Sequence, residues 1–139
     1  MLQKEAAWKF AGIRRERQFS VNAKVIWDFQ ILYHFSRDDF IPAPAVDPVY
    51  LRIKRRKVPL ISPVNYLTFQ RFVAYGFGSW KPSLKHGCRK VFNYRQWKRL
   101  AHQLDFAVKS KPTELTCQQW VKLFRAFQEL VPEEKRRLV

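Results

Sequence analysis

The sequence predicts a mixed α/β segment followed by a helical segment. Two stretches of alternating apolar residues, joined by a proline-rich loop, predict the strands of the first segment. Three stretches that begin with an N-cap residue and continue with apolar residues at helical spacing predict the second segment. We therefore divide the 139 residues into 1–56 and 57–139.

The first segment begins with short elements and continues with two strands. Leu2 and Gln3 are expected to end a strand, residues 6–11 to form a short helix, and Ser20 to cap a helix that continues through Trp27. The next strand has apolar side chains at every second position, which predicts one well-buried face: Phe29, Ile31, Tyr33 and Phe35. Residues 49–54 alternate in the same way. So few strands make a poor independent sheet, and we expect the edge of a larger one.

The second segment contains three predicted helices, 62–76, 94–104 and 116–130. Each begins at a residue whose side chain can accept a bond from the first turn: Ser62, Asn93 and Thr116. Glutamine stands three residues after the second and third caps, as in a capping box. The apolar stripes of these helices predict a small bundle.

The charge of the chain is extreme. The 27 Lys and Arg residues against 11 Asp and Glu residues give a net charge of +16 and a pI near 10.4. Such a balance indicates a polyanionic partner, most simply a nucleic acid, with an anionic membrane surface as the alternative. No apolar run is long enough to span a bilayer, and no signal peptide follows Met1, so we expect a cytoplasmic protein.

The cysteines and histidines predict no metal site. Cys88 and Cys117 lie far apart without a second ligand pair, so free thiols in a reducing compartment are a better interpretation than zinc. His34, His86 and His102 are isolated, and we expect structural roles for them.

The loop from Phe40 to Asp47 carries the pattern Phe-x-Pro-x-Pro-x-Val-Asp, and an apolar-basic strand follows it. Its prolines fix their own φ angles and extend the residues before them, so the loop is stiff. The pattern resembles a signature of the ribosomal RNA adenine N6-dimethyltransferases, the family that includes the macrolide-resistance methylases. That signature closes the catalytic domain in the family. The resemblance therefore implies that this chain is the C-terminal half of such an enzyme.

The resemblance covers nearly the whole chain and implies its fold class. Residues 1–56 would be the C-terminal edge of a Rossmann-like methyltransferase domain, and 57–139 a small helical RNA-binding domain. The implied enzyme is a monomer that transfers a methyl group from S-adenosylmethionine to an adenine of 23S ribosomal RNA. Loop 78–91 lacks the arginine-rich pattern of the small-subunit dimethyltransferases, which favours the macrolide-resistance branch and a role in antibiotic resistance.

The role of Phe40 has two interpretations. From the residues alone it is either a core aromatic that anchors the loop or a surface on which a nucleobase stacks. The resemblance implies the second, with the target adenine against Phe40 and the rest of the substrate loop formed by Pro42, Pro44, Val46 and Asp47. Two positions depart from the family pattern: Ala45 stands where many members carry lysine, and Pro48 where serine is common.

Basic residues in both segments are candidates for RNA binding, although a charge run can equally be a solvated face. The candidates are Arg14, Arg15, Arg17, Lys54, Arg55, Arg56, Lys57, Arg89, Lys90, Arg95 and Lys98.

A donor site is missing from the sequence. Binding S-adenosylmethionine in such a fold needs a glycine-rich turn between a strand and a helix, and the four glycines form no such turn. We therefore expect the chain alone to be inactive. The alternative function is a non-catalytic basic RNA-binding module.

Overall fold

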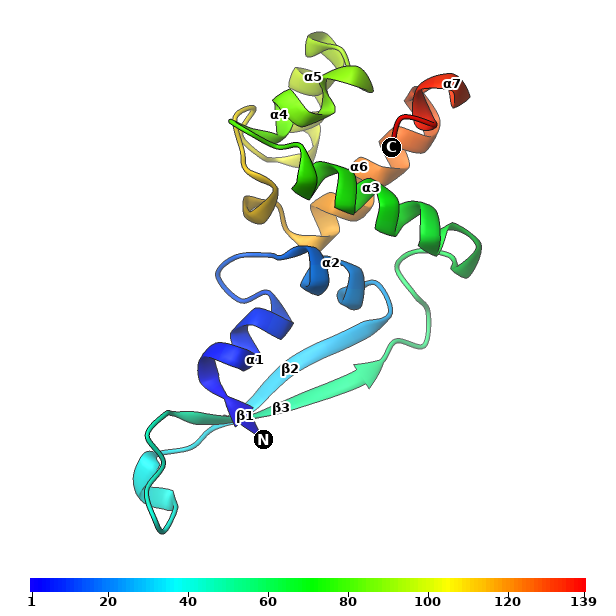
Figure 1. Ribbon diagram of the computed structural model, residues 1–139. Coiled ribbons are helices and arrows are strands. Elements are labelled where there is room, and N and C mark those ends of the chain that lie inside the picture. Colours follow the sequence, from blue (N-terminus) through cyan, green and yellow to red (C-terminus); the bar gives the residue numbers. More distant parts are fainter.

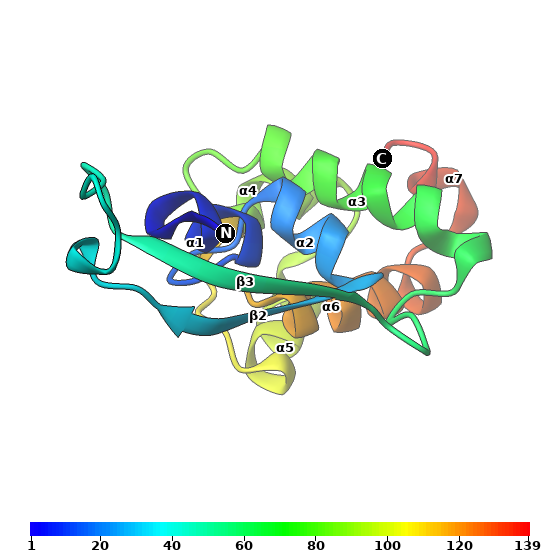
Figure 2. The same cartoon turned by 90° about the horizontal axis from the view of Figure 1, so that it is seen from below.

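A three-stranded antiparallel sheet occupies one end of the molecule in the computed structural model, which describes residues 1–139. The strands are β1 (Leu2–Gln3), β2 (Trp27–His34) and β3 (Pro48–Arg55), in the spatial order β1-β3-β2. Helices α1 (Lys4–Ala11) and α2 (Gln18–Lys24) lie on one side of the sheet in both views (Figures 1 and 2). β1 pairs only with Pro48 and Val49, so the rest of β3 has a neighbouring strand on one side only.

The start and end of α2 correct the sequence prediction. Ser20 does not cap this helix but lies inside its first turn, where its Oγ accepts a hydrogen bond from the Arg17 backbone N–H. The helix ends at Lys24, and Trp27 begins β2 instead, paired with Arg55. Ser20 stands at the third helical position and makes the reciprocal bond, from its side chain back to the N–H of the residue before the helix. Serine is common at both positions, which explains the error.

A β-bulge at Leu32 overturns the prediction of one well-buried face on β2. Ile31 pairs with Leu51, but Tyr33 pairs with Tyr50, so Leu32 is an extra residue in the ladder. The extra residue turns Tyr33 to the opposite face of the sheet from Ile31. Ile31 is half-buried, whereas Tyr33 is 55% exposed.

All three predicted helices are present as α3 (Tyr66–Gly78), α5 (Tyr94–Leu104) and α6 (Cys117–Leu130). Asn93 and Thr116 cap α5 and α6, each accepting a bond from the backbone N–H of a glutamine three residues later. Ser62 makes no such bond, and a 3₁₀ turn, Pro63–Asn65, leads into α3 instead. Short elements without a predicted counterpart are α4 (Leu84–Gly87), α7 (Glu133–Arg136) and 3₁₀ turns at Arg37–Asp39, Cys88–Lys90 and Pro112–Glu114.

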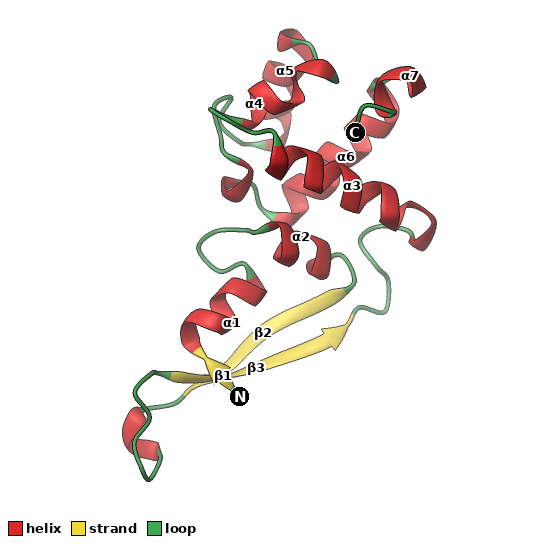
Figure 3. Ribbon diagram, in the orientation of Figure 1, coloured by secondary structure: helices red, strands yellow, loops and turns green.

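Helices α3 to α7 gather at the end of the molecule away from the sheet (Figure 3). Their core is aromatic, with Phe72 of α3 packed against Trp120, Phe124 and Phe127 of α6. Val21 and Val25, at α2, belong to the same hydrophobic cluster. The core therefore crosses the expected division after residue 56, and that division stays a prediction. None of the helices is both long and apolar enough to cross a membrane.

Candidate nucleic-acid interface

The predicted substrate loop projects beyond the end of the sheet, away from the helical end of the molecule (Figures 1 and 2). Its base is closed by an ion pair in which Arg37 Nε lies 2.8 Å from Asp47 Oδ1. The Asp47 carbonyl also accepts a bond from the Lys4 backbone N–H. Asp47 therefore holds the two ends of the loop together. Arg37 was not among the predicted site residues, because its partner lies ten residues away in the chain.

Phe40 lies outside the hydrophobic core, half-buried at the end of the 3₁₀ turn. Its ring packs edge-on against Phe35, with centroids 5.5 Å apart. Phe35 in turn packs edge-on against Tyr33, at 4.8 Å. Edge-to-face contact leaves ring surface free for a further aromatic partner. The role of Phe40 in stacking on a base stays a prediction.

The basic residues predicted to bind RNA differ in their exposure and in their contacts within the protein. Arg14 is exposed and lies 4.2 Å from the centre of the Trp8 ring, in a cation–π contact. Arg56 is half-buried, and its Nε donates to the Lys24 carbonyl at 2.7 Å, so it joins β3 to α2. The other candidates up to the end of the basic run at residue 57 are exposed: Arg15, Arg17, Lys54, Arg55 and Lys57.

A hollow of about 650 Å³ on α5 gathers basic groups. The predicted Arg95 and Lys98 line it, together with residues that were not among the candidates: Tyr94, Arg99, His102 and Gln103. None of its cationic residues forms an ion pair with a carboxylate. Arg95, Lys98, Arg99 and His102 stand three or four residues apart, so they share one face of α5. This spacing could have indicated the surface from the sequence. The surface suits a row of phosphates.

The basic surface continues beyond α5. Arg89 lines a neighbouring hollow of about 260 Å³ together with Lys85 and His86, and Lys90 is exposed in the same turn. The Lys85 ammonium lies 5.1 Å from the centre of the Tyr94 ring. Tyr94 is thus an exposed aromatic ring surrounded by cations. The α5 surface and the Phe40 loop lie at opposite ends of the molecule, so the structure does not bring all predicted residues together (Figure 1).

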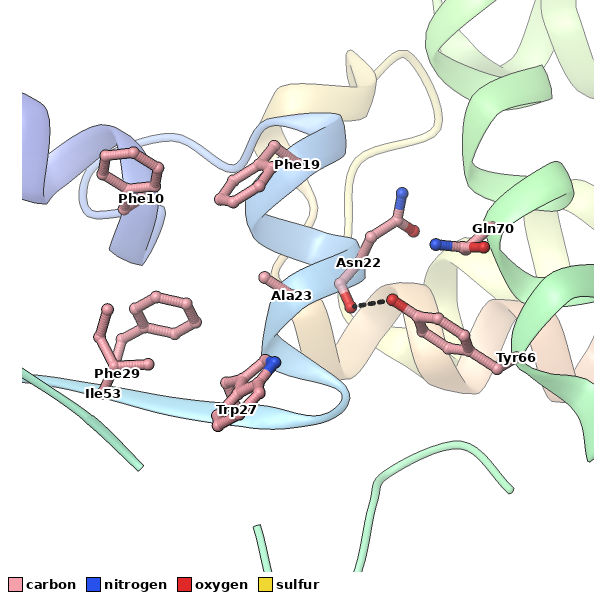
Figure 4. Close-up of a pocket in the computed structure, with 9 residues that line it drawn as sticks. All are labelled: Phe10, Phe19, Asn22, Ala23, Trp27, Phe29, Ile53, Tyr66 and Gln70. Carbon is pink, nitrogen blue, oxygen red and sulfur yellow. Dashed lines mark hydrogen bonds between the residues drawn. The ribbon is translucent and has the colours of Figure 1, made fainter. Parts of the chain in front are cut away.

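An apolar groove of about 470 Å³ lies where α1, α2, the sheet and α3 meet (Figure 4). Its walls include the aromatic side chains Phe10, Phe19, Trp27 and Phe29. The Asn22 Oδ1 atom beside it is buried without a hydrogen-bond partner. None of the predicted site residues lines this groove.

The two cysteines are buried and free. Burial raises the pKa of the Cys88 thiol to about 12 and that of Cys117 to about 11, so neither is a thiolate near neutral pH. No three His, Cys, Asp or Glu side chains gather closely enough to hold a metal ion.

Comparison with known proteins finds relatives but no matching family model. The rRNA adenine N-6-methyltransferase of Bacillus licheniformis is 26% identical over 135 residues, which are 97% of this chain and 47% of the relative. The ribosomal RNA small subunit methyltransferase A of Nostoc sp. is 27% identical over 127 residues, or 88% of this chain and 46% of the relative. The chain is a relative of the rRNA adenine N6-methyltransferases. It spans about half the length of the curated relatives it matches.

A crystal structure of the 23S rRNA methyltransferase ErmE has the same fold over most of this chain. The TM-score is 0.81 at 20% sequence identity, and the match covers 91% of this chain and 52% of ErmE. Together, the sequence relatives and this fold confirm the family resemblance expected from the Phe40 loop. The relatives include both rRNA adenine N-6-methyltransferases and small subunit methyltransferases. The macrolide-resistance branch therefore stays a prediction from loop 78–91.

Proposed function

We propose that this chain is the C-terminal portion of an rRNA adenine N6-methyltransferase of the macrolide-resistance type, acting on 23S ribosomal RNA. The observation that carries the proposal is the match of 97% of this chain to about half of an rRNA adenine N-6-methyltransferase. The small sheet would then be the edge of a Rossmann-like domain. The free edge of β3 supports this, because a further strand can pair there.

The reaction of such an enzyme takes a methyl group from S-adenosylmethionine. The donor would supply the methyl group that the adenine amino nitrogen receives. We assign no residue of this chain to the methyl donor. Its glycines do not fit a donor turn, since Gly12 follows α1, Gly76 and Gly78 lie in α3, and Gly87 ends α4.

The contribution of this chain is to hold the RNA. Phe40 would provide the surface against which the flipped adenine stacks, and the stiff loop with its Arg37–Asp47 ion pair would fix its position. The α5 surface would bind phosphates at the other end of the molecule. A substrate that reaches both is a folded RNA and not a single nucleotide.

Binding of a labelled 23S rRNA hairpin at a series of salt concentrations tests the phosphate contacts. We expect affinity to fall steeply with salt, because each neutralised phosphate releases counterions. Replacing Arg95 and Lys98 by Gln should lower the slope of log K against log salt by about 1 for each phosphate that is no longer neutralised. Lys122→Gln with Lys135→Gln removes the same charge from exposed positions outside the α5 surface, and should leave the slope nearly unchanged. An affinity that stays flat with salt would contradict the proposal.

Phe40 variants test the stacking role in the complete enzyme. Phe40→Ala should remove about 1–3 kcal/mol of base contact, or roughly a fivefold to 150-fold loss of methyl-transfer efficiency. Phe40→Tyr and Phe40→Trp should retain most of the activity, because the ring face makes the contact. A core role would instead cost about 3–5 kcal/mol of stability, so melting and turnover of the same variant separate the two.

The alternative of a non-catalytic RNA-binding module makes a different prediction about the gene. The proposed enzyme needs a glycine-rich donor segment encoded upstream of Met1, and the module does not. Sequencing the upstream DNA distinguishes them.

A further inference from the structure

The bulge at Leu32 has a consequence for the sheet surface beside Phe40. Phe29 and Ile31 of β2 pair with Ile53 and Leu51 of β3 on one face. Beyond the bulge, Tyr33 pairs with Tyr50, which points to the other face because strand side chains alternate. Bulges often redirect side chains next to functional sites.

Phe35 follows Tyr33 onto this other face. Its backbone N–H donates to the Pro48 carbonyl at 3.1 Å, which keeps it beside β3, and its ring meets Tyr33 at 4.8 Å. Phe40 then packs on Phe35. Three aromatic rings thus form a continuous row from the sheet to Phe40, where the substrate loop begins.

The sheet surface at the Tyr33 end of this row is exposed. Tyr33 is 55% exposed and Tyr50 is 50% exposed, and neither hydroxyl makes a hydrogen bond within the protein. Two neighbouring tyrosines with free ring surfaces and free hydroxyls can stack with bases and hydrogen-bond to them.

Cations lie on the same face. Tyr50, Arg52 and Lys54 stand at every second position of β3 and so share one face. Arg52 Nη2 donates to Gln30 Oε1, its cross-strand neighbour, at 2.5 Å. Arg52 forms no ion pair with a carboxylate. Asp28, opposite Lys54, is the acid on this face, and it lies 3.9 Å from the Arg56 guanidinium. Aromatic rings beside free cations are the combination that binds single-stranded nucleic acid.

We propose that Tyr33, Phe35, Tyr50 and Arg52, here called the aromatic face, bind the nucleotide next to the base held by Phe40. A neighbouring base stacks on Tyr33 or Tyr50, and Arg52 contacts its phosphate. This inference rests on the proposed function, because it extends the Phe40 site along the same RNA strand. The face would make the enzyme prefer a target adenine whose neighbour is also unpaired.

The test uses this chain and a short single-stranded RNA with 2-aminopurine next to an adenine. Stacking on a tyrosine quenches 2-aminopurine fluorescence, so we expect the parent chain to quench it. Tyr33→Ala and Tyr50→Ala should lose the quenching and weaken binding roughly fivefold to 150-fold. Tyr33→Phe should retain both. The tyrosine variants should bind a duplex RNA as the parent does, because the bases of a duplex are already stacked on one another.

Phe19→Ala is the matched control, because Phe19 is 57% exposed but lines the apolar groove. It should bind and quench as the parent does. If the tyrosine variants also behave as the parent while Arg95→Gln with Lys98→Gln weakens binding, the aromatic face is wrong and the proposed function stands. A parent chain that binds no RNA overturns both. Tyrosine variants that melt early but bind normally would show that the face packs against protein.

Discussion

Glu16 is the residue that ties three parts of the chain together. It is nearly buried, its carboxylate accepts bonds from Ser20 Oγ at 2.6 Å and Lys24 Nζ at 2.5 Å, and its backbone N–H donates to the Thr113 carbonyl. Gly12 makes room for it, since a Cβ there would lie 2.1 Å from Glu16 Oε2, and its φ of +62° also favours glycine.

Glu16→Ala should therefore lower the free energy of unfolding by about 2–3 kcal/mol, because Lys24 and Ser20 lose a charged partner. Urea denaturation measures this. Arg37→Ala is the control, since it breaks an ion pair whose side chains are 54% and 46% exposed and should cost at most about 1 kcal/mol. If both variants lost the same free energy of unfolding, the buried hydrogen bonds of Glu16 would not stabilise the fold as proposed.

The buried thiols predict a pH dependence of stability. Burial raises the pKa of Cys88 to about 12 and that of Cys117 to about 11, above the value of about 8.5 for an unfolded thiol. The unfolded chain therefore loses these protons first as pH rises. The two protonated thiols contribute their full stabilisation below about pH 8.5. The free energy of unfolding should fall as the pH rises above that value. Urea denaturation between pH 7 and 10 should show a shallower fall in Cys88→Ala than in the parent.

At the scale of helices, α3 offers a matched pair of glycines. A Cβ at Gly76 would lie 2.6 Å from Cη2 of Trp120, which is fully buried and has no room to move, whereas Gly78 has nothing within 4 Å. Gly76→Ala should cost about 1–3 kcal/mol through overpacking. Gly78→Ala should be neutral or stabilise by up to about 1 kcal/mol, through helix propensity. Thermal melting compares the two, and an unchanged melting temperature in Gly76→Ala would mean that α3 and α6 can move apart.

The elements that the sequence predicted are those with local signals. Asn93 and Thr116 start α5 and α6 because each cap bonds within its own first turn. The bulge at Leu32 was missed, because it is defined only by the pairing with β3, and Ser20 misled because a cap and a first-turn serine look alike. The same limit applied to the site. Arg95 and Lys98 lie on one exposed helix face, but the bond of Arg56 to the Lys24 carbonyl depends on tertiary packing.

For the whole molecule, the proposed function is that this chain holds the RNA and contains no donor site. It therefore predicts that this chain does not bind S-adenosylmethionine. Calorimetric titration with S-adenosylmethionine should give no heat of binding at micromolar concentrations, since no glycine of the chain fits a donor turn. The same sample should still bind RNA, which serves as the positive control. Micromolar binding of the donor would mean that the apolar groove, or another site here, holds it, and would overturn the assignment.

The unpaired edge of β3 also affects how copies of this chain meet one another. Backbone N–H and C=O groups on an open edge can accept a strand from another molecule, which is a route to aggregation. Arg52, Lys54 and Arg55 lie on this strand, so two copies that approached edge to edge would bring like charges together. The repulsion is screened as ionic strength rises. High salt, which should release RNA if the proposed phosphate contacts form, would therefore also remove the protection of this edge against self-association.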